Sequence, residues 1–142
     1  MIGVFNMYFK LYSDGAYQPR NQQGAGGVII VSQHQQKQLK TSFIATSNHT
    51  AEFQACIFAF TSLKQKLTTS ERSSAIVTYY TDSRLVAESI TKHYAKHYQP
   101  QVDQIIALQT EFKLVFNNWL PDSHNHGAHE LAQQALHQVD QR

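Results

Sequence analysis

Apolar residues alternate with polar ones in the first part of this chain and recur three and four apart in later segments. The order of these strand-like and helix-like patterns limits the folds that the chain can adopt. Between Val4 and Ser13, apolar and polar side chains alternate, which is typical of a strand with one buried face. Further strands are predicted at about Gly26–Ser32 and Leu39–Ala45, with a polar turn at Gln33–Gln36 between them. Three consecutive strands with short connections favour an antiparallel meander.

The second part of the chain alternates helical and strand-like segments. Apolar residues recur three and four apart over residues 51–67, so we expect a long helix that begins near Asn48 and ends at about Thr68. Strands are expected at Ala75–Thr81 and Leu114–Trp119. Because helices connect these strands, they should pair in parallel, which predicts an α/β fold with a mixed five-stranded sheet flanked by helices. The shorter helices are expected around Leu85–Ile90, Val102–Leu108 and Ala128–Val139, with a polar link over residues 69–74.

Composition narrows the class of protein. The chain has 142 residues, of which 42% are hydrophobic, so we expect a single domain over residues 1–142. A formal net charge of +2 allows a polyanionic partner without requiring one. The one cysteine, Cys56, cannot form an internal disulfide and is expected in the core. Since no stretch resembles a signal peptide or a membrane span, we expect a cytoplasmic monomer that does not bind membranes.

Acidic residues follow two of the predicted strands. Asp14, with Gly15, is expected to end the first strand, and Asp82 ends the fourth. If these strands are parallel neighbours about 4.8 Å apart, the two carboxylates share the edge where open α/β sheets bind ligands. Glu52, expected in the first turn of the long helix, can face the same edge. Three converging carboxylates raise one another's pKa unless a cation neutralises them, and hard oxygen ligands favour magnesium or manganese.

Four motifs together are more specific than any one of them. They occur in one order along nearly the whole chain, and in this respect the sequence resembles the type 1 ribonuclease H family. The resemblance implies a five-stranded ribonuclease H-like fold and hydrolysis of the RNA strand of RNA/DNA hybrids by an endonuclease with two bound metal ions. The motifs are Ser13–Ala16, Asn48–Glu52, Thr81–Ser83 and Asn125–Ala132.

The same resemblance implies roles for individual residues. Asp14, Glu52 and Asp82 would be catalytic metal ligands, with Asp14 shared between two Mg²⁺ or Mn²⁺ ions about 3.5 to 4 Å apart. The family usually carries an aspartate at the position of His129, so His129 would be a substituted fourth ligand. Because a neutral imidazole adds no negative charge, we expect activity that favours manganese and rises with pH. Substrate-binding candidates are Gly15, Asn48 and Ser83.

The chain also lacks a basic insertion that some members of the family carry between two helices. Lys92–Tyr98 is what remains there, so fewer cationic contacts to phosphate are expected and hybrid affinity should be lower. This segment could be an aromatic and basic handle for nucleic acid, although a surface connection between helices is the commoner explanation. His124 lies near a loop in which many members carry a histidine, but the loop is shorter here, and we assign His124 no role.

Simpler interpretations exist for each residue taken alone. Asp14 before a glycine is ordinary turn chemistry, Glu52 could complement a helix dipole, and Asp82 or Ser83 could cap a helix. The spacing of the histidines near the C-terminus matches no closed zinc site. Trp119 is interpreted as packing at a strand end.

Two other functions fit the same fold. The main alternative is a catalytically weak or inactive module that binds nucleic acid or a protein partner. Retention of three of the four acidic ligands favours the enzyme instead. Another nuclease of the superfamily, such as a resolvase or an exonuclease, is the second alternative, and Asn125–Ala132 argues against it.

Overall fold

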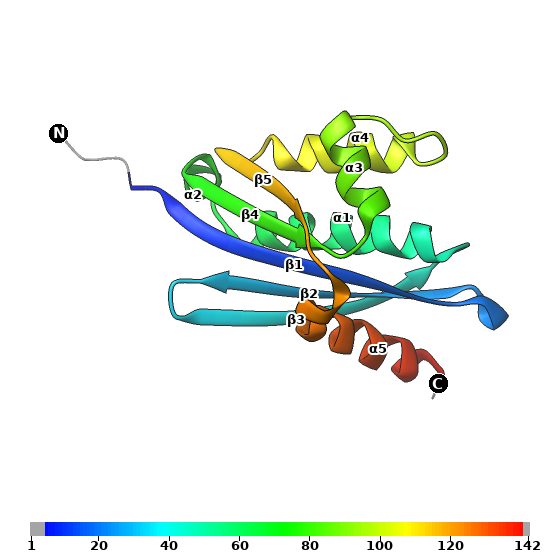
Figure 1. Cartoon of the computed structure of the whole chain (residues 1–142). Helices are drawn as coiled ribbons and strands as arrows, with labels where there is room; N and C mark the ends of the chain where they lie inside the picture. The colour runs from blue at the N-terminus through cyan, green and yellow to red at the C-terminus, as the bar shows by residue number, and fades with distance from the viewer. Residues whose placement is uncertain (1–4, 141–142) are drawn as a thin grey trace.

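The computed structural model describes residues 5–140, which form a five-stranded sheet with helices on both faces (Figure 1). The strands lie in the order β3-β2-β1-β4-β5, with β1, β2 and β3 antiparallel and β1, β4 and β5 parallel. This arrangement is the predicted meander followed by parallel strands. The strands are β1 (Met7–Gln18), β2 (Gln23–Ser32), β3 (Gln35–Ile44), β4 (Ala75–Thr81) and β5 (Leu114–Trp119). The helices are α1 (Asn48–Lys66), α2 (Thr69–Ser73), α3 (Arg84–Lys92), α4 (Gln99–Gln109) and α5 (His126–Asp140), with 3-10 turns η1 (Pro19–Asn21) and η2 (Asp122–His124).

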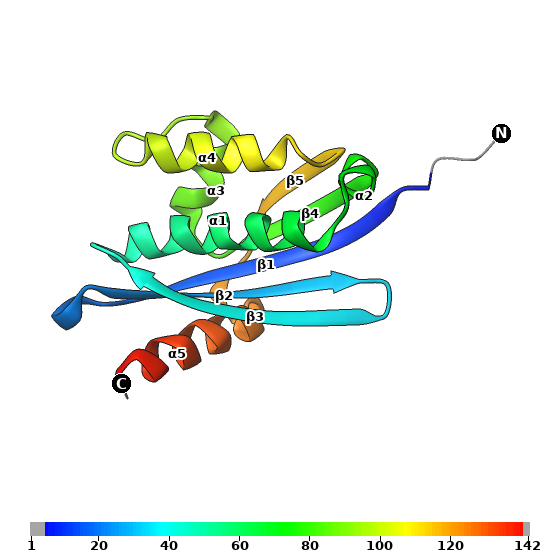
Figure 2. The ribbon, with the colours of Figure 1, turned by 180° about the vertical axis from the view of Figure 1, so that it is seen from behind.

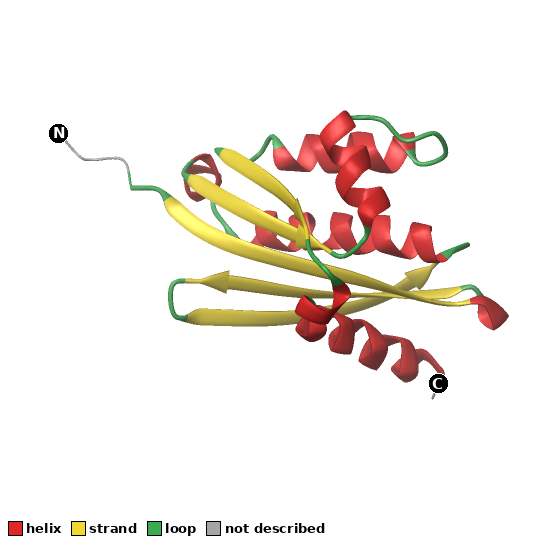
Figure 3. Ribbon diagram, in the orientation of Figure 1, coloured by secondary structure: helices red, strands yellow, loops and turns green. Residues whose placement is uncertain are grey.

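The sheet separates α1 from α5, as the views from both sides show (Figures 2 and 3). Two successive residues of β2 demonstrate this, because neighbouring strand residues face opposite sides. A Cβ atom on Gly26 would meet Ala55 of α1, whereas one on Gly27 would collide with the Ala128 carbonyl of α5. The absence of a side chain at Gly27 therefore lets α5 pack directly on the strand. Helices α3 and α4 lie on the α1 side (Figure 2).

The main core lies between the sheet and α1. Alternate residues of β1 and β4, such as Leu11, Val77 and Tyr79, are fully buried against Phe53 and Phe60 of α1. Burying a side chain of this size stabilises a fold by about 1.5–3 kcal/mol. The long helix begins where the sequence predicts, because the Ser47 side chain caps it by accepting a hydrogen bond from the Thr50 N–H, at 3.0 Å.

Strand β1 is longer than predicted. The expectation that Asp14 and Gly15 end it is wrong, since β1 continues to Gln18, paired with Gln23 of β2. The parallel pairing of β1 with β4 does stop at Ser13, because β4 ends at the paired residue Thr81. The antiparallel pairing of β1 with β2 continues beyond it. The predicted start at Val4 lies outside the described residues.

Other boundaries also differ from the prediction, since β2 begins at Gln23 rather than Gly26 and β3 begins at Gln35 rather than Leu39. The polar link at residues 69–74 contains α2, which begins with a capping box between Thr68 and Glu71, a Thr-x-x-Glu signal present in the sequence. The turn predicted at Gln33–Gln36 is shorter in the structure: pairing of Ser32 with Gln35 confines it to Gln33 and His34, and the other two residues belong to β3. Among residues 5–140, no helix combines the length and apolarity needed to cross a bilayer.

Candidate active site

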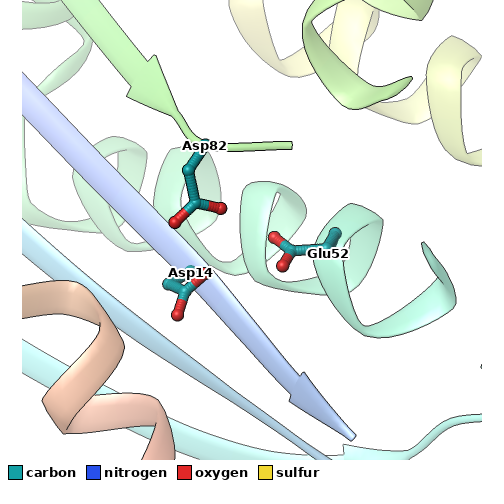
Figure 4. A group of neighbouring side chains, drawn as sticks. All are labelled: Asp14, Glu52 and Asp82. Carbon is teal, nitrogen blue, oxygen red and sulfur yellow. The ribbon is translucent and has the colours of Figure 1, made fainter. Parts of the chain in front are cut away.

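Three carboxylates converge at the end of the parallel pairing between β1 and β4 (Figure 4). Asp14 comes from β1, Asp82 directly follows β4, and Glu52 comes from α1. One oxygen from each carboxylate lies within 4.8 Å of the others. Asp14 and Glu52 are buried, at 3% and 8% exposure, and Asp82 is half-buried. The structure thus brings together the three acidic residues selected from the sequence.

Pairing and a close approach of backbones explain this convergence. The register pairs Ser13 with Thr81, so Asp14 and Asp82 are the next residues on adjacent strands. A Cβ atom on Gly15 would lie 2.6 Å from the backbone of Ala51, so α1 can approach β1 this closely only where the side chain is absent. The Gly15 N–H donates a hydrogen bond to Glu52 Oε2 at 3.2 Å. Gly15 therefore holds a carboxylate in place, a role that the sequence did not predict for it.

Glu52 lies deeper in α1 than expected. It is the fifth residue of the helix, so its predicted place in the first turn is wrong. Interaction with the helix dipole falls off within the first turn and does not account for a carboxylate at this position. The Glu52 carboxylate instead accepts a hydrogen bond from the Gly15 N–H and lies beside the carboxylates of Asp14 and Asp82.

Burial and mutual repulsion make the carboxylates of Asp14 and Glu52 unusually basic. The pKa of Asp14 is raised to about 7, chiefly by burial and then by Asp82, although His129 partly offsets the shift. The pKa of Glu52 is raised well above its ordinary value by burial and by the charges of Asp14 and Asp82. Among the described residues, no lysine or arginine lies within ion-pair distance of these groups. A cluster of anionic oxygens without a protein cation fits a hard divalent metal ion.

His129 reaches the cluster from α5. Its Nδ1 atom lies 2.9 Å from Asp14 Oδ2, and about half of its side chain is exposed. His129 is not one of the three residues whose ligand atoms all lie within 4.8 Å of one another, and it contacts this cluster through Asp14. Its position allows it either to donate a hydrogen bond to Asp14 or to share a metal ion with it.

Asn125, which was quoted within the last motif without a role, ties α5 to both strands. It is 2% exposed, and its Nδ2 group donates to the Ser13 carbonyl at 2.9 Å and to Asp82 Oδ2 at 3.2 Å. Its Oδ1 atom has no hydrogen-bond partner among the described residues. Asn125 therefore orients Asp82 relative to the strand that carries Asp14.

The cluster opens into a cleft of about 730 Å³. All seven candidate residues line it, including Asn48 and Ser83. Ser83 also caps α3, since its Oγ accepts a hydrogen bond from the Val86 N–H at 3.2 Å, as the simpler interpretation predicted. Residues of the lining that the sequence analysis missed are Tyr17, His49, Arg84, Trp119, Asp122 and Gln133.

Several other sequence interpretations are decided by the structure. Trp119 ends β5 and is 40% exposed, and besides its place at the strand end it lines the cleft, which the sequence did not predict. Tyr98 stacks on Phe53 with 4.8 Å between ring centroids, which supports a structural role for that part of the connection between helices. Cys56 is fully buried and its pKa is raised to about 12, chiefly by burial, as expected of a core thiol.

Comparison with known proteins decides the family. A sequence model of the family described as RNase H matches residues 6–137. The chain belongs to the RNase H family. Consistent with RNase H membership, the fold and motif order are those implied by the sequence resemblance. The chain is also similar to the EbsB protein of Enterococcus faecalis, with 33% identity over 129 residues, which are 89% of this chain and 93% of EbsB.

Solved RNase H structures share the fold. RNase H1 from Halobacterium salinarum superimposes with a TM-score of 0.81 at 21% identity, over 92% of this chain and 98% of that one. LC11-RNase H1, solved in complex with an RNA/DNA hybrid, gives a TM-score of 0.77 at 22% identity, again over 92% of this chain and 98% of that one. These similarities confirm the predicted RNase H-like fold class.

Proposed function

We propose that this RNase H-family chain is an endonuclease that hydrolyses the RNA strand of RNA/DNA hybrids with the help of divalent metal ions. The observation that carries the proposal is the cluster of Asp14, Glu52 and Asp82 within 4.8 Å, at the base of an open cleft. The family assignment supports this reaction, and LC11-RNase H1 was solved with a hybrid bound.

The residues that would hold the ions are Asp14, Glu52, Asp82 and His129. When bound, two divalent ions supply an activated water and charge stabilisation of the leaving oxygen. The protein provides preorganised ligands: the Gly15 N–H restrains Glu52, and Asn125 restrains Asp82. Since His129 replaces a carboxylate, the site carries less negative charge, and we propose that Mn²⁺ supports more activity than Mg²⁺.

Substrate recognition would occur on the walls of the cleft. Asn48 is exposed at the start of α1, and Ser83, which directly follows Asp82, lines the same cleft. Polar groups in these positions can contact the 2′-hydroxyl that distinguishes RNA from DNA. We therefore propose that Asn48 and Ser83 contact the RNA strand.

The proposal is tested by cleavage of a labelled RNA/DNA hybrid, with RNA and DNA duplexes as substrate controls. The wild type should cut only the hybrid, in Mn²⁺ or Mg²⁺ and not in a chelator, and Asp14→Asn should lose at least a hundredfold in kcat. Asp122→Asn is the matched control, because Asp122 is an exposed carboxylate that lines the same cleft outside the cluster. A folded wild type that binds the hybrid and cuts it in neither metal would favour the alternative of an inactive binding module.

A further inference from the structure

Arg84 and Trp119 form a stacked pair at the edge of the cleft. Arg84 is the first residue of α3 and Trp119 the last of β5, and both line the cleft. The Arg84 guanidinium carbon lies 4.0 Å from the centroid of the Trp119 ring. The Trp119 Nε1–H donates a hydrogen bond to the Asp82 carbonyl at 3.0 Å. This pair of side chains therefore connects the edge of the cleft to the backbone of Asp82, whose carboxylate belongs to the cluster.

The charges in the cleft make Arg84 distinctive. Asp14, Glu52, Asp82 and Asp122 all line the cleft, and a polyanion that enters meets their combined repulsion. Among the described residues, Arg84 is the one lysine or arginine in the lining. No described carboxylate lies within ion-pair distance of its guanidinium, and no described protein group accepts a hydrogen bond from it. Its position is set by stacking, while its N–H donors remain available to an anion.

We infer that Arg84, held on the face of Trp119, binds a backbone phosphate of nucleic acid at the cleft, and that Trp119 positions Asp82. The class of ligand rests on the proposed function. A planar guanidinium suits this role because its face can stack while its edge binds phosphate oxygens in a bidentate manner. Trp119 acts through its N–H group, which restrains the Asp82 peptide immediately after β4 ends.

The phosphate site is tested by hybrid binding without cleavage. The Kd of a labelled RNA/DNA hybrid is measured in EDTA over a salt series for the wild type, Arg84→Gln, Arg84→Lys and Lys66→Gln. Arg84→Gln should weaken binding about tenfold near 0.1 M salt and reduce the slope of log Kd against log salt by about one. Arg84→Lys should keep the slope and recover part of the affinity, since the charge remains but the stacked fork is lost.

Lys66→Gln is the matched control, because it removes the same charge from the exposed last residue of α1, outside the cleft lining. It should change Kd less than twofold. Equal Kd values and equal salt slopes for Arg84→Gln and Lys66→Gln would overturn the phosphate site. A wild type that binds no hybrid at any salt concentration would overturn it as well.

The positioning role of Trp119 is tested by metal affinity without substrate. Calorimetric titration with Mn²⁺ should give an affinity several-fold weaker for Trp119→Phe, which keeps an aromatic face but lacks the N–H donor. Hybrid Kd should stay within about twofold, because stacking remains. Phe116→Leu, an exposed aromatic position on the same strand, should leave Mn²⁺ affinity unchanged. Unchanged Mn²⁺ affinity in Trp119→Phe would refute the positioning role.

These measurements separate this inference from the proposed function. If the wild type binds the hybrid and does not cut it, hydrolysis is refuted, whereas the Kd series still decides Arg84 and the Mn²⁺ titration still decides Trp119. If the hybrid is cut and Arg84→Gln behaves as Lys66→Gln does, the reaction stands and the phosphate site is wrong.

Discussion

The Nδ1 atom of His129 lies 2.9 Å from Oδ2 of Asp14, so the last helix places an imidazole directly beside a carboxylate of the proposed metal site. Asp14 is 3% exposed and half of the His129 side chain is accessible. The imidazole therefore stands on the open side of a buried carboxylate. Its contact lowers the pKa of Asp14, against the larger effect of burial.

The first prediction is that His129→Asp increases activity in Mg²⁺. A carboxylate at this position adds a hard anionic ligand, which favours Mg²⁺ more than an imidazole does. We expect kcat in Mg²⁺ to rise about tenfold and the preference for Mn²⁺ to shrink. Cleavage rates are compared in both metals, with His126→Asp as the control, since His126 is exposed at the start of the same helix outside the cleft lining. Equal rates for the two variants would contradict a role of His129 at the metal.

The second prediction concerns the pH dependence of metal binding. The pKa of Asp14 is about 7 in the metal-free protein, so a proton must leave it before a metal binds at lower pH. Deprotonation of Asp14 alone should raise the apparent Mn²⁺ affinity roughly fivefold between pH 6 and 7, and the raised pKa of Glu52 should steepen this rise and extend it above pH 7. Calorimetric titrations at pH 6, 7 and 8 measure this. A constant affinity over that range would refute it.

The third prediction is that Asp14→Asn stabilises the metal-free protein at high pH. The folded-state pKa is about 7, above the ordinary carboxyl value, so the cost of the buried charge is absent well below pH 4 and grows as the pH rises toward 7. At pH 8 in EDTA, we expect Asp14→Asn to gain on the order of 2 kcal/mol in free energy of unfolding, or about 6 °C in Tm.

Thermal denaturation at pH 5 and pH 8 checks this sign. Asp122→Asn serves as the control, because the exposed Asp122 stays in contact with solvent and its charge is not buried by folding. The advantage of Asp14→Asn should shrink at pH 5 and when Mn²⁺ is added to both proteins, since the metal neutralises the carboxylates only in the wild type. A larger advantage at pH 5 than at pH 8 would show the opposite sign and refute the argument.

The fourth prediction is that Gly15→Ala damages both stability and the site. The added methyl group would lie 2.6 Å from the backbone of Ala51, so α1 must move away from β1. Strain of this kind costs about 1–3 kcal/mol, and the movement withdraws Glu52 from the cluster. Gly26→Ala is the control, because its nearest contact with Ala55 is 3.3 Å and requires a smaller shift. Urea denaturation and Mn²⁺ affinity should both show a larger loss for Gly15→Ala than for Gly26→Ala.

Local patterns predicted the regular elements well where both ends carry clear signals. The bounds of β4 and β5 agree with the prediction, since each strand is rich in β-branched or aromatic residues and a polar or helix-breaking residue follows soon after it. The end of β1 was predicted wrongly because local turn chemistry at Asp14 and Gly15 competes with pairing to β2, a tertiary interaction. The short α2 was missed although Thr68 and Glu71 form a capping box in the sequence.

The sequence by itself determined the family, the order of the strands and longer helices, and the three carboxylates. Strand periodicity and parallel pairing place Asp14 and Asp82 at one edge whatever the details of packing. Only the tertiary structure decided which other groups act on them. The Asn125 bridge to Asp82, the contact of His129 with Asp14 and the stack of Arg84 on Trp119 join residues 43, 115 and about 35 positions apart. Such contacts depend on how helices dock on the sheet, which side-chain packing sets and no local pattern encodes.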